Sequence, residues 1–218
     1  MKLILVRHGE SLWNLENRFT GWVDVSLSPK GREEAKNAGE LIKSLNIDIG
    51  VCYTSILKRA NETLGIILDV LKINPPIYKS YKLNERHYGA LQGLNKDECK
   101  KEFGEELFFK YRRSFKTRPP EAKDNSLSIK TDDYNPKTES LEDTYKRVTE
   151  YYNDEIKNKL KTENVLIAAH GNTLRSLIKY LDNVSDEDIE HVEVKTGQVI
   201  VYTFDDKLNV ISKKIYEK

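Results

Sequence analysis

Two short apolar runs that each end in His-Gly constrain this chain more than any other feature. Residues 3–6 precede Arg7-His8-Gly9, and residues 165–169 precede His170-Gly171. Consecutive apolar residues of this kind predict strands that are buried on both faces of a parallel sheet. Ligands of open α/β sheets bind just beyond the carboxyl ends of the strands. We therefore expect the two imidazoles to meet at one edge of a central sheet.

The rest of the chain alternates between helical and extended patterns. Helical spacing of apolar residues, with Ser28-Pro29 and Ser140 as helix starts, predicts helices over 28–45, 56–71, 95–103, 105–115, 140–160 and 174–181. Strands are predicted over 47–53, 77–78, 192–194, 199–204 and 210–215, with His191 at a strand edge. This alternation predicts an α/β fold with a mostly parallel central sheet and helices on both faces.

No linker divides the 218 residues, so we expect a single domain over 1–218. The stretch from 83 to 93 has no clear period and is predicted to be a functional loop. Residues 116–138 are polar, contain three prolines, and are predicted to be the mobile segment. Its flanks are expected to belong to one cap over the sheet.

Charge and cysteine content exclude several function classes. The 36 basic and 35 acidic residues leave a formal net charge of +1, so no general electrostatic case exists for nucleic acid or an anionic membrane. Cys52 and Cys99 form no CxxC pair, and the four histidines show no metal spacing, so we expect reduced thiols and no metal. No apolar run approaches the roughly 20 residues of a membrane span, and no signal peptide precedes the first strand. We expect a cytoplasmic protein.

His8 is the candidate nucleophile. A lone histidine is often a core residue that caps a strand, but this one follows a buried strand, adjoins Arg7 and precedes a glycine that lets a ligand approach. A neutral imidazole, with its ordinary pKa of about 6.5, is a competent nucleophile near neutral pH. To attack phosphorus, His8 needs one free ring nitrogen and the other held as N–H, for which a backbone carbonyl in the turn is the natural acceptor.

The remaining candidates suit an anionic substrate. Arg7 and Arg59 offer planar forks for a phosphoryl group, and His170 adds an imidazole next to the N–H groups of a helix start. Glu85 is the candidate general acid for the leaving oxygen. Read alone, Arg59 could be a surface arginine, Arg112-Arg113 a solvated helix face, and Glu85 an exposed carboxylate; His87 is expected to form hydrogen bonds within its loop. Two imidazoles among arginines favour phosphoryl transfer.

The motif Arg7-His8-Gly9-Glu10-Ser11, with the distant His170-Gly171, resembles the histidine phosphatase superfamily. Residues 19–22, 53–60, 83–96 and 168–175 resemble, more narrowly, cofactor-dependent phosphoglycerate mutase. The resemblance spans nearly the whole chain, and the block 83–96 is the part most specific to the mutase branch. It implies the phosphoglycerate mutase fold, with a small helical cap at about 83–140 inserted over the active site.

The resemblance also implies residue roles. His8 matches the histidine that is phosphorylated and Glu85 the proton donor, while His170 matches the second histidine, which acts on the phosphoryl group with Arg7 and Arg59. These five form the predicted catalytic set. The predicted substrate-binding set is Arg7, Gly9, Glu10, Ser11, Asn14, Thr20, Gly21, Arg59, Glu85, Arg86, His87, Tyr88, Lys96, Arg112, Arg113, Gly171 and Asn172.

The implied activity is the interconversion of 3-phosphoglycerate and 2-phosphoglycerate in glycolysis and gluconeogenesis, through a phosphohistidine at His8. The implied cofactor is 2,3-bisphosphoglycerate, which primes the enzyme, and no metal is used. The implied partner is the small phosphoglycerate substrate, with no nucleic acid and no membrane. The family often forms dimers or tetramers, so the resemblance allows a homodimer or a homotetramer.

Three departures from the family pattern keep other functions open. Residues 116–138 are shorter than usual, the chain stops at Lys218 without the usual tail, and Gln198-Val199 stands where the family often has Val-Pro. A wetter pocket would favour hydrolysis over transfer. One alternative is therefore a histidine phosphatase that hydrolyses phosphomonoesters or bisphosphoglycerate on the same fold. Another is a catalytically silent phosphate-ligand binder or scaffold, which would not need His8, Glu85 and His170 together.

Overall fold

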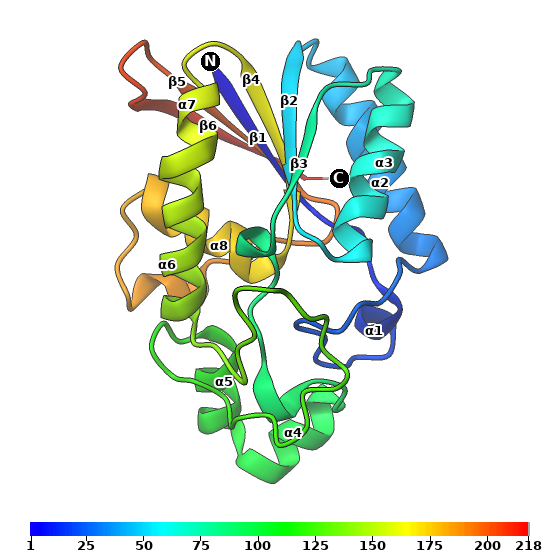
Figure 1. Cartoon of the computed structure of the whole chain (residues 1–218), viewed down its shortest axis with the longest axis vertical. Helices are drawn as coiled ribbons and strands as arrows, with labels where there is room; N and C mark the ends of the chain where they lie inside the picture. The colour runs from blue at the N-terminus through cyan, green and yellow to red at the C-terminus, as the bar shows by residue number, and fades with distance from the viewer. Residues whose placement is uncertain (218) are drawn as a thin grey trace.

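A sheet forms the centre of the computed structural model, which describes residues 1–217 (Figure 1). Its strands in chain order are β1 (Lys2–Arg7), β2 (Ile49–Thr54), β3 (Ile77–Lys79), β4 (Asn164–Ala169), β5 (Val199–Phe204) and β6 (Val210–Tyr216). Across the sheet they lie in the order β3-β2-β4-β1-β5-β6. The strands β1 to β4 are parallel to one another, whereas β5 is antiparallel to both β1 and β6.

Helices cover both faces of this sheet (Figure 1). These are α2 (Pro29–Ser44) and α3 (Lys58–Leu71) on one face, and α6 (Leu141–Tyr151) and α8 (Gly171–Leu181) on the other. The remaining helices are α1 (Leu12–Leu15), α4 (Lys96–Phe103), α5 (Glu105–Arg113) and α7 (Lys157–Lys159). Successive side chains of β1 point to opposite faces, so Ile4 packs with α2 and α3 while Leu5 packs with α6 and α8. The predicted α/β fold, with a mostly parallel sheet between helices, is confirmed.

The register of the two central strands brings the His-Gly motifs together. In the parallel pair β1–β4, Arg7 lies opposite Ala169, so His8 and His170 follow at the same edge of the sheet. The backbone N–H of His8 donates to the carbonyl of Ala169 at 2.9 Å, which carries the pairing one residue past the strand. The prediction that both imidazoles meet at one edge is confirmed.

The chain between β3 and α6 forms a cap beyond that edge, with α4 and α5 at its far end (Figure 1). Two short 3₁₀ helices, Tyr81–Leu83 and Gly89–Leu91, lead into it. The segment 116–138 carries no helix or strand and is held by backbone hydrogen bonds, such as Ile129 N–H to the carbonyl of Trp22 at 3.0 Å. Its mobility stays a prediction. At the end of the cap, Ser140 begins α6 with a capping box completed by Asp143.

The sequence-based expectations for residues 191–194 are wrong, whereas the helix predicted over 140–160 is present with one irregularity. Residues 192–194 alternate like a strand, but they pair with no other strand, because the carbonyl of Val194 accepts a hydrogen bond from the Arg7 side chain. His191 ends a 3₁₀ helix (Asp188–His191) and lies at no strand edge. The predicted helix over 140–160 is interrupted by a π-helical turn (Tyr152–Ile156) between α6 and α7. In the described chain, every helix is too short or too polar to cross a membrane.

Candidate active site

A strongly basic cavity opens at the sheet edge where β1 and β4 end. Seven basic side chains and two carboxylates line it. The lining residues are Arg7, His8, Asn14, Arg18, Phe19, Thr20, Gly21, Arg59, Glu85, Tyr88, Lys96, Arg112, Arg113, Gly171, Asn172, Arg175, Glu193 and Val194. The cavity therefore suits a small anionic ligand, with most of the predicted site residues gathered around it.

His8 has the geometry of a nucleophile at the base of this cavity. Its Nδ1 lies 2.6 Å from the carbonyl oxygen of Gly9 and donates to it, which leaves Nε2 as the free nitrogen. Burial, and then the guanidinium groups of Arg59 and Arg7, hold the pKa of His8 well below its ordinary value. The imidazole is therefore neutral at neutral pH, and the backbone-carbonyl acceptor expected from the sequence is present.

His170 is fully buried beside His8, with the two ring centroids 5.1 Å apart. Its Nε2 lies 2.7 Å from the hydroxyl oxygen of Ser55, which itself accepts the N–H of Leu57 at 3.1 Å. A Ser55 hydroxyl that donates to Nε2 leaves the proton of His170 on Nδ1, and this buried nitrogen has no partner among the described residues. Burial, and then Arg59 and His8, lower the pKa of His170 well below its ordinary value. His170 can thus donate one hydrogen bond to an anion without itself carrying charge.

Arg59 and Arg7 bring permanent charge to the same place. Arg59, from the first turn of α3, is anchored by hydrogen bonds to the carbonyls of Val23 (3.0 Å) and Gly21 (2.7 Å), and burial lowers its pKa to about 10. Arg7 donates from Nη1 to the carbonyl of Val194 at 2.6 Å, while its buried Nε has no partner in residues 1–217. Buried donors of this kind are costly unless a ligand satisfies them. Both side chains are anchored and still have donors for phosphoryl oxygens.

Glu85 enters the cavity from the loop before the cap. Its Oε1 accepts the backbone N–H groups of Arg86 at 2.8 Å and Asn172 at 3.1 Å, and the indole of Trp22 donates to its carbonyl at 2.6 Å. Its Oε2 makes no hydrogen bond within the described chain and is free for a ligand atom. A carboxyl group with a fixed orientation and one free oxygen can give a proton to a leaving group or accept one from a nucleophile.

The cap adds a second group of cations. Lys96 begins α4, and Arg112 and Arg113 end α5, so all three come from cap helices. Burial, and then Arg112 and Arg7, lower the pKa of Lys96 to about 8. Arg113 faces Glu193 at 3.7 Å, a weak contact that leaves it available to a ligand.

Five of the predicted binding residues lie outside the cavity. Gly9 packs its backbone against Gly31, where a Cβ would lie 2.0 Å from the carbonyl oxygen. The carboxylate of Glu10 accepts the hydroxyl of Ser28, and Ser11 caps α1. The other two, Arg86 and His87, are buried within the cap: Arg86 donates to the carbonyls of Glu139 and Thr117. His87 accepts the N–H of Gly89 and faces Asn125 and Ser128, which extends its expected contacts beyond its own loop.

Sequence reasoning did not single out five residues of the cavity wall: Arg18, Phe19, Arg175, Glu193 and Val194. For Arg175 a signal exists, because it stands on the apolar face of α8 between Leu174 and Leu177. A charged residue on such a face needs buried partners, and Arg175 donates to Asn172 Oδ1 at 2.8 Å and to the carbonyl of Arg113 at 3.0 Å. It thereby links the catalytic edge to the cap.

The part of the chain that is described contains no group of three or more His, Cys, Asp or Glu residues placed to hold a metal ion, and Cys52 and Cys99 are both buried and free. Two neutral imidazoles, fixed arginines and one free carboxylate oxygen are the components of phosphoryl transfer to a histidine.

Known structures share this architecture along the whole chain. YhfR from Bacillus stearothermophilus is 26% identical, with a TM-score of 0.75, and the match covers 96% of this chain and 93% of that one. The alpha-ribazole phosphatase from Shigella flexneri is 22% identical, with a TM-score of 0.73 and coverage of 99% and 95%. The mycobacterial glucosyl-3-phosphoglycerate phosphatase Rv2419c is 20% identical, with a TM-score of 0.71 and coverage of 98% and 96%. At these last two identities the likeness shows the fold alone.

The family itself is shown by a match over nearly the full length. A family model for the histidine phosphatase superfamily (branch 1) matches residues 3–215. That span contains both His-Gly motifs, the anchored arginines and the cap. This chain therefore belongs to the histidine phosphatase superfamily, branch 1.

Proposed function

We propose that this enzyme is a 2,3-bisphosphoglycerate-dependent phosphoglycerate mutase that works through a phosphohistidine at His8. The free Nε2 of His8 attacks phosphorus, the bond from phosphorus to the substrate oxygen breaks, and Glu85 gives that oxygen a proton. In the catalytic cycle phosphorylated His8 gives its phosphoryl group to the free 2-hydroxyl of 3-phosphoglycerate, whose proton goes to the Glu85 carboxylate. His8 then takes the 3-phosphoryl group of the resulting bisphosphoglycerate, Glu85 returns the proton to the 3-oxygen, and 2-phosphoglycerate leaves. Arg7, Arg59 and His170 hold the equatorial oxygens throughout, where negative charge accumulates.

Bisphosphoglycerate supplies the phosphoryl group that primes His8. The buried Nε of Arg7 and the Nδ1 of His170 are donors without protein partners, so the site fits a phosphoryl group between them. We expect these two atoms to donate to the bound group, and Arg59 to add charge from its anchored position. Neutral His8 enters the reaction without first losing a proton, because its pKa is low.

The observation that carries the mutase proposal is the second set of cations. One phosphoryl group near His8 is served by Arg7 and Arg59, but Lys96, Arg112 and Arg113 line the same cavity from the cap. These three suit a further anionic group on the same substrate, such as the carboxylate or second phosphate of a phosphoglycerate. A general phosphomonoesterase does not need them.

Hydrolysis is the second candidate. The similar structures whose names state an activity are phosphatases, one of them for a phosphoglycerate derivative, and these names favour hydrolysis over transfer. In that reaction water takes the place of the second hydroxyl: its proton goes to Glu85, its oxygen bonds to phosphorus, and inorganic phosphate leaves His8. The shared first step is the same phosphohistidine.

One coupled assay separates the candidates. The enzyme is given 3-phosphoglycerate with and without 2,3-bisphosphoglycerate, and 2-phosphoglycerate and inorganic phosphate are measured together. The mutase proposal expects 2-phosphoglycerate to form faster than phosphate and to depend on the primer; faster phosphate release would establish the phosphatase. We expect His8→Ala to abolish both products and the acid-labile label from the primer, while His191→Asn, at an exposed position, leaves them unchanged. Ligand binding without label in the wild type would contradict both candidates and indicate a silent binder.

A further inference from the structure

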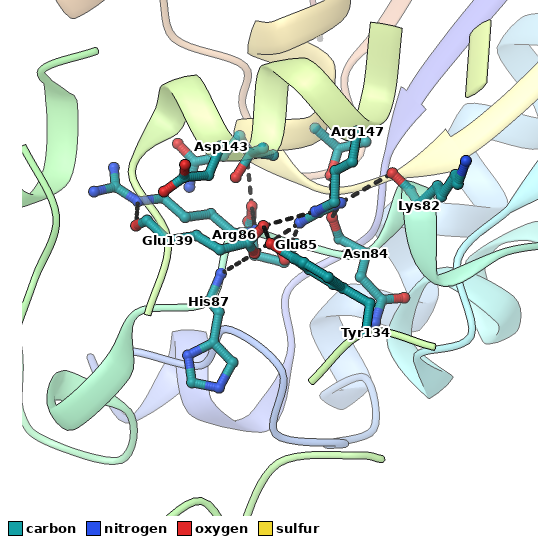
Figure 2. Close-up of polar contacts among 12 residues, drawn as sticks. Lys82, Asn84, Glu85, Arg86, His87, Tyr134, Glu139, Asp143 and Arg147 are labelled. Atoms are coloured by element: carbon teal, nitrogen blue, oxygen red, sulfur yellow. Dashed lines mark hydrogen bonds and ion pairs between the residues drawn. The ribbon is translucent and has the colours of Figure 1, made fainter. Parts of the chain in front are cut away.

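A buried ion pair lies behind the loop that carries Glu85. Glu139 immediately precedes Ser140, the N-cap of α6, and Arg147 follows about two turns later on that helix. The Nε of Arg147 donates to Oε2 of Glu139 at 2.8 Å and Nη2 donates to Oε1 at 3.0 Å, and the two side chains are only 8% and 0% exposed. Figure 2 shows Arg147 pointing from its helix toward the Glu85 loop. This is a bidentate pair in a dry environment.

The other donors of Arg147 all go to the backbone of that loop. Nη1 donates to the carbonyls of Lys82 and Asn84, each at 2.9 Å, and Nη2 donates to the carbonyl of Glu85 at 2.9 Å (Figure 2). A guanidinium has five N–H groups, so every donor of Arg147 is used. Three of the five hold the backbone of Glu85 and of two residues that precede it, Lys82 and Asn84.

Glu139 holds the same loop from its other end. Its Oε1 also accepts the backbone N–H of His87 at 2.9 Å, its own N–H donates to the carbonyl of His87 at 2.8 Å, and its carbonyl accepts Nε of Arg86 at 2.9 Å. The two residues of this ion pair therefore hold the loop backbone from Lys82 to His87 at both ends. Neither Glu139 nor Arg147 lines the cavity, and every donor of Arg147 is engaged by protein acceptors, so none is left for a substrate.

Stability alone is a weak reason for such a pair. Burial of two charges costs several kcal/mol of desolvation for each ion, and well-packed apolar residues often replace such pairs without loss. Here the hydrogen bonds converge on one short loop, and that loop carries the carboxyl group whose free oxygen must meet a leaving group. A displacement of about 1 Å at a reacting group can cost about a hundredfold in rate.

We propose that Arg147 and Glu139 are positioning residues that fix the Glu85 carboxyl group for proton transfer. The inference rests on the proposed role of Glu85 as the general acid. Loosening the pair lets the loop shift, so the free oxygen of Glu85 no longer meets the leaving oxygen, while His8 and its arginines stay in place. The variants therefore slow proton transfer to the leaving oxygen and leave the attack of His8 on phosphorus unchanged.

The test compares two phosphoryl donors with different needs for a proton. Rapid quench measures the rate at which His8 is labelled by 2,3-bisphosphoglycerate, whose leaving alkoxide needs a proton, and by para-nitrophenyl phosphate, whose leaving phenolate needs none. We expect Arg147→Lys and Glu139→Gln to slow labelling by bisphosphoglycerate about 10- to 100-fold and to change labelling by the aryl phosphate less than about twofold. The two variants keep, respectively, the charge and the shape, so either one suffices if the other does not fold.

Val148→Ala is the matched control, because Val148 is the next residue on α6 and is buried in the core against the sheet. It loosens core packing and removes no hydrogen bond of the Glu85 loop, so we expect it to lower stability and to leave both labelling rates unchanged. Glu85→Gln shows how the two labelling rates change when the general acid is absent. If Glu85→Gln slows both donors equally, the assignment of Glu85 fails; if it discriminates between them and the pair variants do not, the positioning role is refuted while the proposed function stands.

Discussion

Lys96 gives the site a pH dependence that can be worked out in advance. Burial, and then the neighbouring Arg112 and Arg7, lower the pKa of Lys96 to about 8. The side chain is therefore charged below pH 8 and neutral above it, with about half of the free enzyme charged at pH 8 and about a tenth at pH 9. An anionic substrate binds the charged form. We expect kcat/KM to fall about tenfold per pH unit above pH 8.

The fall in kcat/KM reports the titration of Lys96 in the free enzyme. We expect kcat to stay constant over the same pH range, because the bound anion keeps Lys96 protonated. A phosphate monoester completes its second ionisation near pH 6, so the substrate does not titrate in this window. Arg59 keeps its guanidinium charge throughout this window. The assay is a steady-state series in 3-phosphoglycerate from pH 7 to 9.5 at fixed ionic strength.

Three variants complete this test. Lys96→Met should have a lower kcat/KM that no longer falls above pH 8, and Lys96→Arg should retain charge and flatten the profile at a higher level. Lys101→Met, on the exposed side of the same helix, should behave as the wild type. A wild-type profile that is flat to pH 9.5, or the same fall in Lys96→Met, would refute the reasoning.

The remaining predictions concern stability. His8 and His170 are held neutral by burial, so below about pH 6.5 the unfolded chain binds protons that the folded one does not, and each histidine lowers the free energy of unfolding by up to about 1.4 kcal/mol per pH unit. Urea unfolding between pH 7.5 and 5 should show this fall, and His170→Asn should reduce it; an equal slope in both proteins would contradict it. Gly65→Ala, inside α3 with open space around the added Cβ, should stabilise by about 0.5–1 kcal/mol. Gly31→Ala, whose Cβ would lie 1.9 Å from the carbonyl oxygen of Glu10, should destabilise by about 1–3 kcal/mol, and equal urea midpoints for the two variants would be inconsistent with this account.

Local sequence pattern was sufficient to predict the central sheet and the position of His8 at its edge. The strand before His8 and the strand before His170 are continuous apolar runs, and such runs imply burial and parallel pairing without knowledge of distant residues. Pairing then places both imidazoles at one edge, whatever the cap does. The helix start at Ser28-Pro29 and the capping box at Ser140 are likewise local, and both are present.

What the sequence could not supply are contacts between distant residues. Residues 192–194 have the alternation of a strand, yet Arg7 takes the carbonyl of Val194 and no ladder forms. Gly9 and Glu10 adjoin the nucleophile in sequence, but their environment is set by α2 and not by the cavity. Glu139 meets His87 across 52 positions, a separation that no periodicity reveals.

The contact between His87 and Glu139 also bears on how the substrate range of this fold can diversify. The chain enters the cap at one of these residues and leaves it at the other, and their mutual hydrogen bonds close everything between them into a loop. The entropy of closing such a loop changes by only about 0.6 kcal/mol for each doubling of its length. Insertions and deletions in the cap can therefore reshape the side of the cavity that Lys96, Arg112 and Arg113 line while Glu85 keeps its place, so that new specificities can be acquired without changing the proposed chemistry at His8.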